Sequence, residues 1–160
     1  MKVKITKESD ERIEFELDGA QTYFANALRR IAMSAIPAVA IDTVTFYENS
    51  SSSFDEYIAN RLGLIPLKAP LGYCPKGGFA LLSLDKEGPC TIYSSDLKSK
   101  DGSVKIAIPN IPILKLLEHH SIRIEAKAVS GIALSHAKFQ ACLASYEKKG
   151  ADSFSFFIES

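Results

Sequence analysis

The chain has 160 residues, of which 46% are hydrophobic, enough for a packed core in one domain or two small ones. Lys+Arg and Asp+Glu both number 19, so the formal net charge is zero. This balance argues against a general nucleic-acid-binding protein, which normally has a basic excess. Because no apolar run is long enough for a membrane span and "MKVKITKESDER" lacks a signal core, we expect a cytoplasmic protein without a membrane segment.

Three cysteines, Cys74, Cys90 and Cys142, are an odd number without close pairing. They are typical of free thiols in a reducing compartment rather than of a disulfide framework. Their spacing also does not suit a zinc ion or an iron–sulfur cluster. We therefore expect no cofactor and no metal.

Both ends of the chain predict antiparallel hairpins. "KVKITK" and "RIEFEL" alternate polar and apolar residues on either side of "ESDER", and "KFQACLASYE" and "SFSFFIES" do so on either side of "KKGAD". We expect each hairpin to bury one face. In the first hairpin, the apolar residues of that face are Val3, Ile5, Ile13, Phe15 and Leu17.

The segment that follows the first hairpin predicts an amphipathic helix. Phe24, Leu28 and Ile31 recur at helical spacing, and the helix should end near Ile36 because Pro37 follows. We expect this stripe to face a sheet.

The middle of the chain is mixed. "VAIDTVTFYEN" predicts a strand with a bulge near Thr43, where the alternation slips. "SFDEYIANRLGLIPL" predicts a second helix, capped by Ser53, favoured by Asp55 and Glu56 in its first turn, and ended by Gly63. "FALLSLD", "CTIYSSDL" and "SIRIEAKAV" predict strands, and "IPILKLLEHH" is either helical or extended.

This order predicts an α+β fold in which two terminal hairpins form an antiparallel sheet covered by an amphipathic helix. Residues 1–37 and 140–160 would then make one discontinuous domain, interrupted by a mixed α/β inserted domain at residues 38–139.

Catalytic patterns are scarce. His119, His120 and His136 have no metal-like partners at helical or hairpin spacing, and acids at a helix start, such as Asp55 and Glu56, are far more often capping residues. We therefore predict no active site in this chain.

The adjacent Arg29 and Arg30 are the sharpest remaining feature. Adjacent helical residues point about 100° apart, so at least one of the two arginines faces away from a buried stripe. Such a residue, like Arg61 in "ANRLGLIP", belongs either to a solvated surface or to a protein interface, where Arg is enriched.

Several ordered motifs closely resemble the α-like subunit of DNA-directed RNA polymerase. They are "N-x-LRR" (Asn26 to Arg30), "IP-x-x-AID-x-V" (Ile36 to Val44), "DE-x-IA-x-RLGLIPL" (Asp55 to Leu67), "YSSDLKS", "IPILKL" and "SHAKF". The resemblance covers nearly the whole chain. It is greatest to the archaeal D-type members of this family, with the third subunit of eukaryotic polymerase II and bacterial α more distant.

This resemblance implies a dimerisation domain split by an inserted domain, and a role in assembly. Members of this family pair with a smaller α-like subunit, which is of the L type in archaea. The pair recruits the second-largest subunit, with the small zinc-binding N- and P-type subunits alongside, and the polymerisation chemistry belongs to the two largest subunits. The resemblance makes Asn26, Arg29, Arg30 and Arg61 candidates for partner contacts, and Phe24, Leu28 and Ile31 candidates for the dimer or core face.

Two features depart from the family pattern. Many archaeal relatives carry an iron–sulfur insertion between the last two strands, where this chain has "EKKGAD" without cysteine, so no cluster is implied. Relatives also continue past "IES" into a long C-terminal helix, whereas this sequence stops at Ser160. Two alternatives stay open: a free-standing heterodimerising module without a polymerase role, and a small enzyme with an unrecognised site.

Overall fold

The computed structural model describes residues 1–70, 73, 78–100 and 102–160, so Cys74 lies outside the described residues. It confirms an α+β fold with mostly antiparallel sheets. The chain divides into two compact units. The terminal unit comprises Met1–Ala38 with Ile132–Ser160, and the central unit comprises Val39–Gly131. The sequence predicted slightly different domain limits, residues 1–37 with 140–160 and residues 38–139. As limits of functional domains they stay a prediction.

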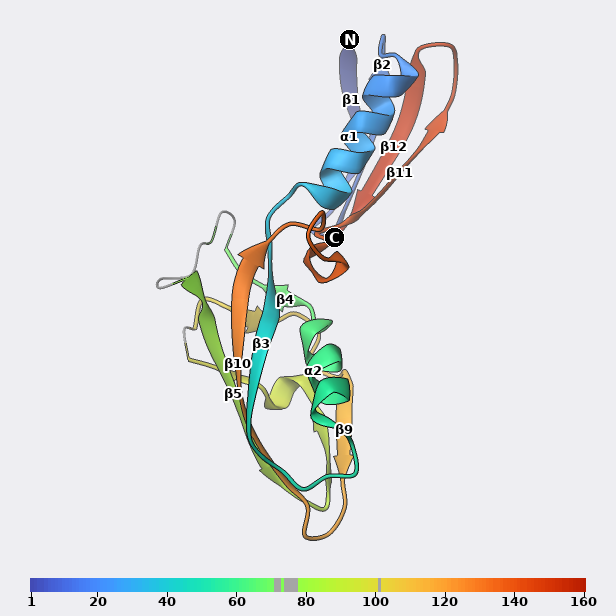
Figure 1. Cartoon of the computed structure of the whole chain (residues 1–160). Coiled ribbons are helices and arrows are strands. Elements are labelled where there is room, and N and C mark those ends of the chain that lie inside the picture. The colour runs from blue at the N-terminus through green and yellow to red at the C-terminus, as the bar shows by residue number, and fades with distance from the viewer. Residues whose placement is uncertain (71–72, 74–77, 101) are drawn as a thin grey trace. The chain divides into compact units, whose positions relative to one another are not determined.

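A four-stranded sheet in the order β1-β2-β12-β11 forms the terminal unit, as Figure 1 shows. Its strands are β1 (Lys2–Glu8), β2 (Arg12–Asp18), β11 (Leu143–Lys148) and β12 (Ser153–Glu159). All neighbouring strands are antiparallel, so both predicted hairpins are confirmed. The pairing of β2 with β12 joins the two ends of the chain in one sheet.

Aromatic residues on β2 and β12 build the core of the terminal unit. Phe15 lies opposite Phe156 and Leu17 opposite Phe154, and the rings of Phe15 and Phe156 stack with their centroids 5.0 Å apart. The helix α1 (Thr22–Ser34) packs Ala25 onto this cluster, so the predicted cover of the sheet by a helix is confirmed. The helix stops two residues before the predicted Ile36.

The face of α1 that meets the sheet differs from the predicted one. Its buried residues are Ala25 and Ala32, with the partly buried Leu28 between them. Phe24 is 39% exposed and Ile31 is 56% exposed, so the chain's own sheet does not cover them, and their expected place in a dimer or core face stays a prediction. The apolar stripe of this helix is wider than the surface that the sheet covers. Helical spacing alone does not show which residues of the stripe the sheet covers.

The edge strand β1 likewise leaves its apolar residues uncovered. Val3 is 59% exposed and Ile5 is 54% exposed, although their register partners Leu17 and Phe15 are buried. The prediction of a buried face therefore holds for β2 and is wrong for β1. Alternation indicates which residues share a face, but not whether another element covers it.

The central unit contains a second four-stranded sheet, in the order β3-β10-β5-β7. Its strands are β3 (Ala38–Asn49), β5 (Ala80–Glu87), β7 (Lys98–Ser99) and β10 (Ser121–Gly131). Two short antiparallel pairs join β4 (Leu67–Lys68) to β8 (Lys105–Ile106), and β6 (Cys90–Tyr93) to β9 (Pro112–Leu116). Thus "IPILKLLEHH" begins as a strand, not as a helix.

The helix α2 (Asp55–Gly63) packs Ile58 and Leu62 into the core of the central unit. It ends at Gly63 as predicted, but the expected cap at Ser53 is wrong. The residue before the helix is Phe54, without a side-chain cap, and Asn49 orders this loop instead. The Asn49 Nδ2 donates to the Ser53 carbonyl oxygen at 3.0 Å and to the Asp55 carboxylate at 2.7 Å.

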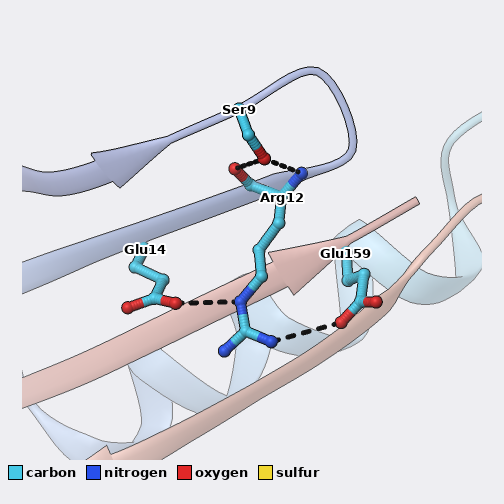
Figure 2. Close-up of polar contacts among 4 residues, drawn as sticks. All are labelled: Ser9, Arg12, Glu14 and Glu159. Atoms are coloured by element: carbon cyan, nitrogen blue, oxygen red, sulfur yellow. Dashed lines mark hydrogen bonds and ion pairs between the residues drawn. The ribbon is translucent and has the colours of Figure 1, made fainter.

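On the face of the terminal sheet opposite α1, Arg12 joins the first hairpin to the last strand (Figure 2). Its Nε lies 2.9 Å from the Glu14 carboxylate, and its Nη1 lies 3.4 Å from that of Glu159. The guanidinium also lies over the Phe157 ring, 4.7 Å from the centroid. The Ser9 hydroxyl bonds the Arg12 backbone N–H and C=O, each at 3.1 Å.

We predict that Arg12→Ala lowers the free energy of unfolding by about 1 kcal/mol, because it removes one part-buried ion pair, one exposed ion pair and one cation–π contact together. Urea denaturation would measure the change. The matched control is Lys149→Ala, which breaks the exposed Lys149–Glu147 pair at 2.7 Å and should cost almost nothing. Equal midpoints for both variants would show that Arg12 does not hold the sheet together.

Candidate subunit interface

An uncovered apolar surface lies on the helix-bearing face of the terminal sheet. Because Val3 pairs with Leu17 and Ile5 with Phe15, the two β1 side chains share the face on which the core is built. Both are more than half exposed. This end of the sheet therefore presents apolar side chains that α1 does not cover.

The orientation of α1 places its own exposed apolar residues on the same side as β1. The helix packs along β11, and the Lys148 ammonium of β11 donates to the Thr22 hydroxyl at 3.4 Å, so the flank with Thr22 faces β11. At 100° per residue, Phe24 and Ile31 lie on the opposite flank. Since β1 and β11 are the two edges of the sheet, this opposite flank faces β1.

These residues together form what we call the apolar strip: Val3, Ile5, Phe24, Leu28 and Ile31. Helical spacing predicted the three helical members. Alternation predicted burial for Val3 and Ile5, because it does not distinguish a covered face from an uncovered one. The signal that could have corrected this is the set of lysines at positions 2, 4 and 7, since lysine is typical of edge strands.

The paired arginines of α1 lie in different surroundings. Arg29 is half-buried, and its Nε and Nη2 both donate to the Asn26 side-chain oxygen, at 3.3 and 3.0 Å. Its Nη1 lies 3.5 Å from the Met33 sulfur. Arg30 is exposed to solvent. Thus Asn26 holds Arg29 along the surface of the helix, while Arg30 points outward.

The third candidate arginine, Arg61, belongs to the central unit and is held inside it. Its Nη1 donates to the Tyr57 hydroxyl at 3.3 Å, and its Nη2 donates to the Pro112 carbonyl oxygen. The guanidinium also lies over the Tyr57 ring, 5.7 Å from the centroid. Arg61 therefore links α2 to β9, and two of its nitrogens are already used within the chain.

The described residues contain no group of three or more His, Cys, Asp and Glu side chains that could hold a metal ion. Cys142 is buried and its Sγ donates to the Ala32 carbonyl oxygen at 3.1 Å, while burial raises the pKa of this thiol. His136 accepts a hydrogen bond from the Lys138 backbone N–H at 3.0 Å. In the part of the chain that the structure describes, no helix is both long and apolar enough to span a membrane.

Comparison with known proteins identifies the family. Residues 33–145 match the model of the RNA polymerase Rpb3/RpoA insert domain. DNA-directed RNA polymerase subunit Rpo3 of Methanocaldococcus jannaschii is 50% identical over 137 residues, which cover 85% of this chain and 69% of the relative. The Rpo3 subunits of Pyrococcus horikoshii and Thermococcus kodakarensis are 44% and 46% identical, over 88% and 86% of this chain.

The chain spans about half the length of most of these relatives, 56% for Pyrococcus horikoshii and 55% for Thermococcus kodakarensis. The family match nevertheless covers most of the chain, and the similarity to the Rpo3 subunits extends beyond the insert domain. The chain belongs to the family of archaeal Rpo3 subunits of DNA-directed RNA polymerase.

Proposed function

We propose that this chain is a non-catalytic assembly subunit of a cytoplasmic DNA-directed RNA polymerase. In this proposal the terminal unit pairs with a smaller, L-type α-like subunit. The pair then recruits the second-largest subunit, with the small zinc-binding N- and P-type subunits alongside. The observation that carries the proposal is the apolar strip, an uncovered surface that suits a protein partner.

The apolar strip supports a protein partner on energetic grounds. Full burial of one large aliphatic or aromatic side chain stabilises a complex by about 1.5–3 kcal/mol. Ile5 and Ile31 are each more than half exposed, so much of this free energy is still available for association. At 100° per residue, Asn26, Arg29 and Arg30 lie on the flank of α1 that carries Thr22, away from the strip, so they suit a contact separate from it.

The arginines support a second contact, with the second-largest subunit. A guanidinium is a planar fork that binds carboxylates and carbonyls through several directed hydrogen bonds. Arg29 is held in place by Asn26, so it presents donors without a large loss of side-chain freedom, while the exposed Arg30 is open to a partner. Arg61 stays a candidate, and its bonds to Tyr57 and Pro112 favour a positioning role.

The zero net charge agrees with a subunit that does not bind DNA sequence-specifically. A free-standing heterodimerising module would use the same apolar strip, so co-purification with the large polymerase subunits distinguishes the two functions. A shallow depression in the central unit, lined among others by Cys90, Lys115 and His120, gives no catalytic arrangement that would favour an enzyme.

We predict that Ile31→Ser weakens pairing with the small α-like subunit about tenfold, because it removes a more than half-exposed apolar side chain from the apolar strip. Isothermal titration calorimetry or quantitative co-purification would measure this. The matched control is Leu134→Ser, since Leu134 is 71% exposed in the same unit but lies outside the strip. If both variants pair as strongly as the unchanged chain, the strip is not the interface.

We also predict that Arg29→Ala combined with Arg30→Ala weakens recruitment of the second-largest subunit at least tenfold. Arginine at an interface centre typically contributes about 2 kcal/mol or more, whereas a solvated arginine contributes almost nothing. The measurement is capture of that subunit by the preformed pair.

The control for this double variant is Lys2→Ala with Lys4→Ala, which removes two cations from the opposite face of the sheet. Thermal melts would monitor folding in both cases. Undiminished capture by the arginine variant would identify Arg29 and Arg30 as ordinary solvated charges. A large fall in melting temperature would instead show that they stabilise the fold.

A further inference from the structure

The edge strands of the two four-stranded sheets differ in how they are protected from further pairing. Exposed edges are commonly protected by short length or by charged side chains, especially lysine. In the terminal sheet, β1 carries Lys2, Lys4 and Lys7, and β11 carries Glu147 and Lys148. In the central sheet, the edge strand β7 has two residues. These three edges are therefore poor templates for another strand.

The fourth edge, β3, lacks this protection at its centre. It is 12 residues long and stands at one end of the sheet order, next to its hydrogen-bonded neighbour β10. Its residues Thr43–Tyr47 are five uncharged residues in a row, all β-branched or aromatic, which are the types that favour strands. Five residues is also the usual length of a strand.

The side chains of this segment also suit an additional strand. Val44 and Phe46 are half-buried and pack against the core of the central unit, so one side of the core is partly open along this edge. Thr43, Thr45 and Tyr47 are exposed on the other face. A strand placed beside β3 would cover Val44 and Phe46 with its own alternate side chains.

The charges at the ends of the segment argue against a second copy of this chain. If two β3 strands paired antiparallel about a twofold axis at Thr45, Asp42 of each copy would face Glu48 of the other. Like charges directly opposite one another destabilise a strand pair. The same two acids would favour a foreign strand with basic residues at its ends.

We propose that, in the assembled polymerase, an extended segment of another polypeptide pairs with β3 along Thr43–Tyr47. This segment has apolar side chains at alternate positions and basic residues at its ends. The inference rests on the proposed function, because the partner comes from the assembled polymerase. It adds a backbone-mediated contact on the central unit to the side-chain contacts proposed for the terminal unit.

Hydrogen–deuterium exchange on the assembled polymerase and on the isolated chain tests the pairing directly. We expect exchange of peptides that cover Thr43–Tyr47 to slow at least about tenfold on assembly, because free edge N–H groups become bonded. The internal reference is β5, which has neighbours on both sides and should change little. Unchanged exchange at Thr43–Tyr47 overturns the proposal, as does equal slowing of β5, which would indicate general stabilisation.

Substitution provides the second test. Thr45→Lys places a charge at the centre of the exposed edge without altering the core, and we expect about fivefold weaker incorporation into the polymerase. The matched control is Thr91→Lys on β6, an exposed threonine of the same unit, which should incorporate normally. Equal incorporation of both variants contradicts strand addition.

The outcomes also separate this inference from the proposed function. If the chain enters the polymerase but the amides of the β3 edge still exchange freely, the proposed function stands and the strand addition is contradicted. A chain that never associates with polymerase subunits contradicts both. If the isolated chain forms a homodimer in which the β3 amides are protected from exchange, a second copy occupies the edge and the proposal of a foreign strand is wrong.

Discussion

One helix cannot cover a four-stranded sheet, and this mismatch in width determines what the terminal unit exposes. A helix with its side chains is about 10–12 Å wide, whereas four strands spaced about 4.8 Å apart span roughly 14–19 Å. Because α1 packs along β11, the opposite edge at β1 stays uncovered. The exposure of Val3 and Ile5 follows from this geometry, and it leaves an apolar surface beside the exposed flank of the helix.

The sequence predicted the elements better than their surroundings. Both hairpins, α1 and the end of α2 at Gly63 follow from local patterns, namely alternation, helical spacing and a glycine stop. The errors concern Val3, Ile5 and Ser53. Burial of the first two depends on how far the helix extends over the sheet, and the cap depends on a loop that Asn49 orders through its own side chain. Neither is encoded in the spacing of the residues concerned.

The candidate site shows the same division. Helical spacing puts Asn26, Arg29 and Arg30 close together on one helix, and Arg29 donates two hydrogen bonds to Asn26 there. The spacing could not distinguish the held Arg29 from the exposed Arg30. For Arg61, the partner carbonyl of Pro112 lies 51 residues along the chain, so no local pattern indicates that this arginine is used inside the central unit.

The terminal unit offers two kinds of contact, the apolar strip and the arginines Arg29 and Arg30, and the β3 edge of the central unit offers a third. The apolar strip gains free energy from water release, which depends little on salt, whereas contacts of Arg29 and Arg30 weaken as salt screens exposed charges. Strand addition at β3 would depend on backbone geometry and would tolerate many partner sequences that keep the alternation. Pairing through the strip should therefore persist at salt concentrations that already weaken recruitment through the arginines.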